Sequence, residues 1–273
     1  MIRKNRSKSS PVGIFDSGAG GLTVASAVKQ LLPHESIIYF GDTAHLPYGD
    51  KSAEAILHYS RKITDFLLGH GCKIILAACN TVSATVWDNL NRYISGKAIP
   101  VNVIDPVVEN VVRLYPGSFI SIIGTKNTVN SLAYPEKIKK LSPGAKVSSL
   151  ATPLLVPMIE EGFINDDISS AIINAYLSDP KLKGTETLIL GCTHYPIIRD
   201  QIIDYYENKV EVIDSAMIVA TRLKEILESN DMLNESSYVT DRFCVSDHTE
   251  YFGKIAAMFF HDQIRVEKID LWR

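Results

Sequence analysis

The stretch Lys73-Ile-Ile-Leu-Ala-Ala-Cys79-Asn80-Thr81 is a short apolar run that ends in a cysteine and two polar residues. The stretch Thr187-Leu-Ile-Leu-Gly-Cys192-Thr193-His194 repeats this design, with its cysteine 113 positions after the first. An apolar run of this length, bounded by small and polar residues, predicts a buried strand. Two such units indicate a chain built from two similar halves.

A second pair of strands with small polar loops supports the duplication. Val12-Gly-Ile-Phe-Asp16-Ser17-Gly18 precedes the first cysteine unit, and Ile120-Ser-Ile-Ile-Gly124-Thr125 precedes the second. The separation from loop to cysteine is 63 residues in the first half and 67 in the second. Two similar α/β halves explain the pattern economically, and a chance resemblance between hydrophobic strands is the alternative.

Helix-period segments lie between several of the apolar runs. From Ala53 to Leu67 the apolar residues fall on one helical face, and Gly69 and Gly71 then precede the next strand. Alternation of strands and helices predicts an α/β fold with largely parallel sheets. The expected buried strands are Val12–Phe15, Ile37–Phe40, Lys73–Ala77, Val101–Ile104, Phe119–Ile123, Thr187–Leu190 and Val210–Ile213, and a strand, a helix and a strand are expected to end the chain.

The composition is that of an ordinary globular protein, with 273 residues, 46% of them hydrophobic and 22% charged. A formal net charge of -3 gives no reason to expect nucleic acid as a partner. No stretch approaches the roughly 18 apolar residues of a membrane helix, so we expect no membrane partner and a cytoplasmic location. Residues 1–10 are basic and Ser-rich with no apolar run behind them, and we expect a disordered extension there.

The four cysteines form neither a disulfide framework nor a zinc pattern. Four cysteines in a chain of this length are too few for a disulfide framework, and no Cys-x-x-Cys pair supports a zinc site. His194 follows Cys192 by two residues without a matching Cys or His pair nearby, so we predict no metal, with a metal ligand as the alternative. Cys72 and Cys244 lack a polar strand-end context, and we interpret them as structural.

Four polar loops, beginning at Asp16, Cys79, Gly124 and Cys192, follow strands of the predicted sheets. Ligands bind at the carboxyl ends of strands in open α/β sheets. If the halves face each other, the two cysteines flank one cleft. Inverting a carbon needs a base on one face and an acid on the other, and a thiolate and a thiol can exchange those roles. A small buried hydrophobe is the alternative interpretation of each cysteine.

The surroundings of the cysteines predict how their protons are controlled. Each precedes an expected helix start, and a helix N-terminus favours the thiolate. Since the ordinary thiol pKa is about 8.5, a modest lowering supplies thiolate near neutral pH. Asp16 and His194 are natural partners for moving or tuning the thiol protons. Lys73 and Lys126 are expected in solvent.

Two further loops are open to several interpretations. Asp16-Ser-Gly-Ala-Gly-Gly21 lacks the lysine of a P-loop and the spacing of a dinucleotide fingerprint, so a phosphate loop, a plain turn and a carboxylate site all remain. Gly41-Asp-Thr-Ala-His-Leu-Pro-Tyr-Gly49 has Pro and Gly residues that fix its backbone shape, with an ordinary loop as the alternative. A break between the halves is expected near Gly96–Pro100.

Taken together, four of these segments resemble the glutamate racemases of the aspartate/glutamate racemase superfamily. The resemblance runs from about Pro11 to the C-terminus. Each motif is weak alone, whereas all four in this order are highly specific. The motifs are Gly13-Ile-Phe-Asp16-Ser17-Gly18-Ala-Gly20-Gly21-Leu-Thr23, Tyr39-Phe-Gly41-Asp42-Thr43 with Pro47-Tyr48-Gly49, Ala78-Cys79-Asn80-Thr81, and Leu190-Gly191-Cys192-Thr193-His194-Tyr195-Pro196.

The resemblance implies a fold of two similar α/β domains with the active site in the cleft between them. The first comprises residues 11–98 and 212–273, and the second residues 99–211. The implied activity is the interconversion of L-glutamate and D-glutamate with no cofactor, neither pyridoxal phosphate nor metal. D-Glutamate would feed peptidoglycan biosynthesis, and so cell-wall biogenesis and cell shape, in a bacterium. The oligomeric state stays open, with a homodimer among the options.

The resemblance also implies roles for individual residues. Cys79 and Cys192 would be the two bases, assisted by Asp16 and His194 respectively. An acidic residue would support His194; Glu160 and Glu161 both qualify, and we favour Glu160. The residues expected to bind the substrate are Asp16, Ser17, Pro47, Tyr48, Gly49, Asn80, Thr81, Thr125, Thr128, Thr193 and His194.

Three alternatives remain at this stage. A racemase or isomerase of the same superfamily would act on another small acid, such as aspartate, a hydantoin or maleate. A binding or regulatory protein on this scaffold would hold glutamate without exchanging its α-proton. A cysteine-dependent hydrolase would form an acyl-enzyme intermediate.

Overall fold

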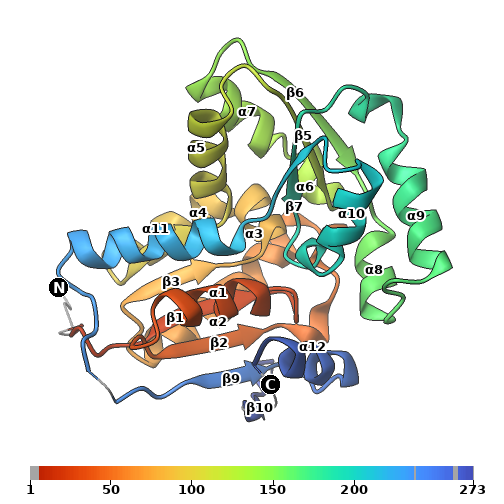
Figure 1. Ribbon diagram of the computed structural model, residues 1–273. Helices are drawn as coiled ribbons and strands as arrows, with labels where there is room; N and C mark the ends of the chain where they lie inside the picture. Colours follow the sequence, from red (N-terminus) through yellow and green to blue (C-terminus); the bar gives the residue numbers. More distant parts are fainter. Residues whose placement is uncertain (1–5, 237, 261–263, 273) are drawn as a thin grey trace.

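The computed structural model describes residues 6–236, 238–260 and 264–272 of the chain. Figure 1 shows two layered units, one above the other, each built on its own sheet with helices on both faces. Every strand pairing among the described residues is parallel, as predicted for an α/β fold. No helix in this part of the chain is long and apolar enough to span a membrane.

The first sheet places β1 at its centre, with β2 on one side and β3 on the other. Among the described residues its strand order is β10-β9-β2-β1-β3-β4. The outer strands β9 and β10 come from the end of the chain, which therefore returns to the first unit. The strands are β1 (Val12–Asp16), β2 (Ile37–Gly41), β3 (Ile74–Ala77), β4 (Ile99–Asn102), β9 (Arg242–Val245) and β10 (Val266–Lys268).

The second sheet repeats this arrangement. Its order is β6-β5-β7-β8, which matches β2-β1-β3-β4 of the first sheet strand for strand. In both, the strand order reverses beside the central strand, and that switch point is where α/β sheets bind ligands. The cysteines follow β3 and β7, which flank the central strands β1 and β5. The strands are β5 (Phe119–Gly124), β6 (Lys146–Ala151), β7 (Thr187–Gly191) and β8 (Glu211–Ile213).

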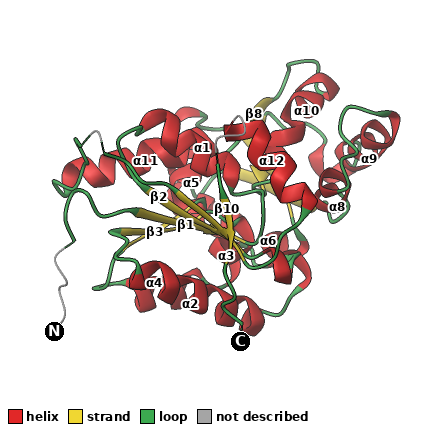
Figure 2. Cartoon of the chain, turned by 90° about the horizontal axis from the view of Figure 1, so that it is seen from below, coloured by secondary structure: helices red, strands yellow, loops and turns green. Residues whose placement is uncertain are grey.

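Helices cover both faces of the first sheet (Figures 1 and 2). One face packs against α1, α11 and α12 through side chains such as Ile14 and Val24, and the other against α2 and α4 through Phe15 and Ile63. Each strand contributes alternate residues to the two cores, because successive side chains point to opposite faces. The helices are α1 (Leu22–Leu31), α2 (Ala53–Gly69), α3 (Asn80–Thr85), α4 (Trp87–Ile94), α11 (Ala216–Ser229) and α12 (Glu250–Phe260), with 3-10 turns at Thr43–His45 and Tyr48–Asp50.

The second sheet is covered in the same way. The core that holds Ile122 and Ile138 joins it to α5 and α7, and the core that holds Ile123 and Ile159 joins it to α8, α9 and α10. The helices are α5 (Ile104–Leu114), α6 (Lys126–Asn130), α7 (Ala133–Leu141), α8 (Leu155–Glu160), α9 (Asp167–Leu177) and α10 (Arg199–Tyr205), with 3-10 turns at Pro180–Leu182 and Tyr195–Ile198.

Each apolar run predicted as a strand overlaps an observed strand, and the largest difference is at β4. That strand begins at Ile99, and Ile104, predicted to end it, begins α5 instead. The Asn102 side chain accepts the Ile104 and Asp105 amides at 2.8 and 2.9 Å, which turns the chain into the helix. The strand β6 was not predicted, because Ser148 and Ser149 interrupt its apolar pattern at the edge of the sheet.

Sheet membership refines the expected domain boundaries. The strand β4 pairs with β3 and so lies in the first sheet, although its residues were assigned to the second domain. The strand β8 pairs with β7, although most of it was assigned to the first domain. We therefore propose units of residues 11–103 with 214–273, and residues 104–213.

The N-terminal segment and Lys73 differ from expectation. Residues 1–5 of the expected disordered extension lie outside the described residues, whereas the chain from Ser7 to Ser10 folds as a turn. Lys73 was expected in solvent, which is wrong: its side chain is fully buried and its Nζ lies 2.7 Å from Glu35 Oε2. The same ammonium donates to the carbonyl of Lys8, because a buried charge needs partners.

Candidate active site

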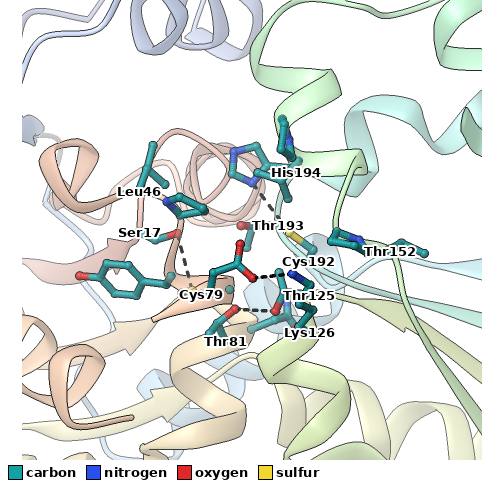
Figure 3. A pocket seen from close by; sticks show the side chains of 18 residues that line it. Ser17, Leu46, Cys79, Thr81, Thr125, Lys126, Thr152, Cys192, Thr193 and His194 are labelled. Atoms are coloured by element: carbon teal, nitrogen blue, oxygen red, sulfur yellow. Dashed lines mark hydrogen bonds and ion pairs between the residues drawn. The ribbon is translucent and has the colours of Figure 1, made fainter. Parts of the chain in front are cut away.

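A cavity of about 590 Å³, its open mouth included, lies where the carboxyl ends of the two sheets meet. Cys79 and Cys192 both line it, one from each unit. Figure 3 shows Cys79 beside Ser17 and Leu46 on one side, and Cys192 beside His194 and Thr152 on the other. The predicted site residues that line it are Ser17, Pro47, Tyr48, Gly49, Cys79, Asn80, Thr81, Thr125, Cys192, Thr193 and His194.

Cys79 is held as a buried thiol at the end of β3. Its side chain is 4% exposed, and its Sγ lies 3.8 Å from Ser17 Oγ. Burial, and after it the carboxylate of Asp16, raises the pKa of Cys79 to about 12. The sequence predicted a lowered pKa from the helix that begins at Asn80. Desolvation of the thiolate outweighs that short helix, so the prediction is wrong for Cys79.

Cys192 faces a histidine that bridges it to a carboxylate. His194 Nδ1 lies 3.8 Å from Cys192 Sγ, and Nε2 lies 3.0 Å from Glu160 Oε1. Burial opposes protonation of the ring, but its hydrogen bonds and charge interactions with Cys192 and Glu160 outweigh that cost and raise the pKa of His194 to about 10. The imidazolium is therefore the stable form at neutral pH. Of the two candidates Glu160 and Glu161, Glu160 makes the contact.

Asp16 lies behind the cavity wall rather than in it. Its side chain is fully buried and accepts the Gly18 amide at 2.9 Å. It also accepts the Thr193 hydroxyl at 3.3 Å, from the loop of the other unit. Asp16 is thus placed to influence Cys79 electrostatically and to join the two polar loops across the interface.

Threonine hydroxyls form a chain along one wall. Thr125 Oγ1 lies 3.0 Å from Thr81 Oγ1 and 3.0 Å from Thr128 Oγ1, and it caps α6 by accepting the Thr128 amide. Thr128 is buried behind Thr125 and does not line the cavity. Thr128 was predicted to bind the substrate, but it is connected to the cavity wall through its contact with Thr125.

The Asn80 amide is held at its oxygen and presents its nitrogen as a donor. Its Oδ1 accepts the Tyr134 hydroxyl at 2.7 Å, which fixes the orientation of the amide. Its Nδ2 is buried and has no hydrogen-bond partner among the described residues. Buried donors are nearly always paired in proteins, so an orphan in a cavity wall indicates a ligand oxygen.

The loop that carries Pro47, Tyr48 and Gly49 closes the mouth from the first unit. The Tyr48 hydroxyl donates to Asp42 Oδ2 at 2.6 Å, and the Tyr48 carbonyl accepts Asn127 Nδ2 at 3.0 Å from α6. A Cβ on Gly49 would lie 2.9 Å from Thr125 Cβ, so only glycine permits this close approach. The loop is therefore fastened to both units.

A family model, Asp/Glu/Hydantoin racemase, matches residues 22–223. A glutamate racemase of Chlorobaculum parvum is 40% identical, over 97% of this chain and 97% of that protein. The crystal structure of a Francisella tularensis glutamate racemase in complex with D-glutamate superposes with a TM-score of 0.90 at 37% identity, over 97% and 99% of the two chains. One from Bacillus anthracis gives 0.92 at 32% identity, over 97% and 98%.

The chain belongs to the glutamate racemases of this family. The fold and the enzyme class predicted from its four motifs are thereby confirmed. Within the described part of this racemase, no group of three or more His, Cys, Asp or Glu side chains is arranged to hold a metal ion.

Several lining residues of the racemase were not predicted. Lys126, expected in solvent, is half exposed, yet it lines the mouth and its Nζ lies 3.2 Å from Asp50 Oδ1 (Figure 3). Both directly follow predicted site residues, Thr125 and Gly49, and that adjacency was the available signal. The remaining unpredicted lining residues are Leu46, Thr152, Pro153, Val156 and Pro157.

Proposed function

We propose that this racemase interconverts L-glutamate and D-glutamate, with Cys79 and Cys192 acting on opposite faces of the α-carbon. The observation that carries the proposal is that two thiols, one from each unit, line the same cavity. A single base returns the proton to the face from which it came, so inversion needs a second group opposite. The similar Francisella enzyme holds D-glutamate, which supports this substrate.

The reaction proceeds by two proton transfers. The thiolate of Cys192 takes the α-proton: the C–H bond breaks, an S–H bond forms, and the electron pair stays on the α-carbon. The thiol of Cys79 then gives its proton to the opposite face, forming the new C–H bond. The two sulfurs have exchanged protonation states, so the reverse reaction starts from the state that the forward reaction leaves.

The electrostatics of the site favour that starting state. With a pKa of about 12, Cys79 is a thiol at neutral pH. With a pKa of about 10, His194 is an imidazolium that donates to Glu160 through Nε2 and points Nδ1 toward Cys192. A positive donor stabilises a thiolate beside it, so Cys192 is the sulfur better placed to begin as the base.

Neutral donors in the wall bind the substrate. Asn80 Nδ2, which has no hydrogen-bond partner among the described residues, would donate to a substrate carboxylate, and the hydroxyls of Thr81 and Thr125 line the same wall. Such preorganised donors are effective where little water competes. Among the described lining residues Lys126 supplies a positive side chain at the mouth, where it attracts a dicarboxylate without neutralising the thiolate.

The chain supplies every acid and base that the two steps require, and we propose that they need no pyridoxal phosphate or metal ion. Both cysteines are free thiols in the structure and must remain so, which suits a reducing compartment such as the cytoplasm. In that compartment D-glutamate would supply peptidoglycan synthesis.

The test is racemisation of pure L-glutamate in deuterium oxide without added cofactor, followed by circular dichroism and mass spectrometry. We expect the first D-glutamate formed to carry solvent deuterium at the α-carbon while the remaining L-glutamate keeps its hydrogen. Cys79→Ser and Cys192→Ser should each abolish net inversion, whereas Cys244→Ala, outside the cavity, should retain it. Full racemisation by either serine variant would overturn the scheme.

Substrate identity has its own test. The enzyme is assayed with pure aspartate and with pure glutamate at equal concentrations. We expect inversion of glutamate to dominate, and a higher kcat/KM for aspartate would assign the site to another small acid.

A further inference from the structure

His194 lies in the second unit, yet two elements of the first unit pack against its ring. The glycine loop after β1 is one of them. A Cβ added to Gly20 would lie 2.5 Å from His194 Nδ1 and 2.6 Å from Thr193 Oγ1. The backbone of this loop is therefore in direct contact with the histidine edge that faces Cys192, and no side chain larger than hydrogen fits between them.

The helix α12, from the returning C-terminal segment, provides the other contact. The Tyr251 ring is parallel to the His194 ring within 15°, with centroids 6.3 Å apart. Offset stacking at this distance is a favourable arrangement of aromatic rings. Tyr251 also packs against hydrophobic clusters of both units, so its ring spans the interface.

The Tyr251 hydroxyl does not account for this placement. Its oxygen is buried and has no hydrogen-bond partner among the described residues. A buried hydroxyl without a partner costs free energy, so the ring is what holds Tyr251 there. This distinguishes the ring contact from a hydrogen-bonding role.

The hydrogen-bonding partners of His194 leave one motion unrestrained. Cys192 and Glu160 contact its two nitrogens at opposite sides of the ring. Contacts at these two points fix an axis through the ring but do not stop the ring from swinging about it. Packing from Gly20 and Tyr251 restricts that swing.

We propose that Gly20 and Tyr251 are positioning residues that clamp His194, so that the Cys192 half of the site becomes competent only when the first unit is docked against it. The inference rests on the proposed two-cysteine mechanism and adds to it a dependence of one base on the other unit. Cys79 differs in that its hydrogen-bond partner, Ser17, belongs to its own unit.

The test must distinguish proton transfer at Cys192 from proton transfer at Cys79, and steady-state rates alone do not distinguish them. The two enantiomers have equal free energy, so kcat/KM is the same in both directions for every variant. Primary deuterium isotope effects do separate the sides. When proton transfer at Cys192 is slowed, that step limits the rate more strongly. The isotope effect then rises for the α-deuterated enantiomer whose deuterium faces Cys192. It falls for the enantiomer whose deuterium faces Cys79.

Tyr251→Ala and Gly20→Ala should therefore lower kcat/KM about tenfold or more, a fraction of what a positioned acid–base group contributes, and move the two isotope effects in opposite directions. Ser17→Ala removes the hydroxyl that contacts Cys79, so it should move each isotope effect in the direction opposite to Tyr251→Ala. This comparison identifies which enantiomer each cysteine deprotonates. Tyr251→Phe keeps the ring and should restore wild-type isotope effects. Gly253→Ala is the matched glycine control, because a Cβ there meets nothing within 4 Å.

Isotope effects that stay at wild-type values, or that move together, in Tyr251→Ala would overturn the clamp. So would a loss of activity in Tyr251→Phe equal to that in Tyr251→Ala. Failure of the two-cysteine mechanism looks different: Cys79→Ser or Cys192→Ser would then keep full racemisation, whatever the Tyr251 variants do.

Discussion

Glu160 Oε1 lies 3.0 Å from His194 Nε2, and this contact joins the end of α8 to the loop after β7. The opposite nitrogen of the same ring faces Cys192. The histidine thus links a carboxylate to a sulfur that the carboxylate does not touch. The neighbouring Glu161 is exposed and makes no such contact.

Glu160→Gln keeps the shape of this contact and removes its charge. We expect the pKa of His194 to fall, because the carboxylate that favours the imidazolium is gone. The value of kcat should fall about tenfold or more, since the acid–base machinery on the Cys192 side is weakened. The checks are the titration of His194 by NMR and steady-state kinetics. Glu161→Gln is the control, and equal losses in both variants would contradict the assignment.

Asn80→Asp replaces the Nδ2 donor with an acceptor of the same size. A buried carboxylate repels a substrate carboxylate, so we expect KM to rise roughly tenfold or more, the scale of a hydrogen bond to a charged group. The thermal midpoint is measured alongside KM to separate binding from folding. Asn89→Asp, on the exposed face of α4, should leave KM unchanged. An unaltered KM in Asn80→Asp would remove Asn80 from the binding wall.

Lys126 and Asp50 at the mouth should affect substrate capture with opposite signs. Lys126→Met removes the attractive charge and its ion pair with Asp50, so KM should rise roughly two- to fivefold, as expected of an exposed charge. Asp50→Asn removes the competing carboxylate, and KM should fall or stay level. Both effects should shrink at high salt, because screening acts on exposed charges. Kinetics at two ionic strengths test this, and KM shifts of the same sign would refute it.

Stability should decline with rising pH. Burial raises the pKa of Cys72 and Cys79 to about 12 and that of Cys244 to about 11, from 9.0. The folded state then holds protons that the unfolded chain releases. This stabilisation is complete below pH 9 and is lost as pH rises toward the folded values, by about 1.4 kcal/mol per pH unit for each retained proton.

The pKa of His194 is raised from 6.5 to about 10. Its proton therefore also stabilises the folded state, and this stabilisation is lost as pH rises from 6.5 to about 10. Thermal midpoints at pH 6, 8 and 10 should therefore fall in that order, and most steeply at the alkaline end. Cys72→Ala with Cys244→Ala should flatten the alkaline decline. A midpoint that is constant or that rises above pH 9 would contradict the burial of these thiols as uncharged groups.

The sequence by itself determined the strands, their parallel alternation with helices, and the two cysteines at matching strand ends. These follow from short-range patterns, because an apolar run between polar or glycine boundaries has few ways to be buried. The four motifs also fixed the enzyme family. The edge strand β6 was not predicted, because its serines interrupt the apolar pattern on which such predictions depend.

Only the tertiary structure decided what depends on residues distant in the chain. It chose Glu160 over Glu161 and paired the buried Lys73 with Glu35. Among the described residues it also left Asn80 Nδ2 without a hydrogen-bond partner. It also reversed the expected pKa of Cys79, because desolvation depends on everything packed around a group rather than on its neighbours in sequence. The contact of Tyr251 with His194 joins segments that no local pattern relates.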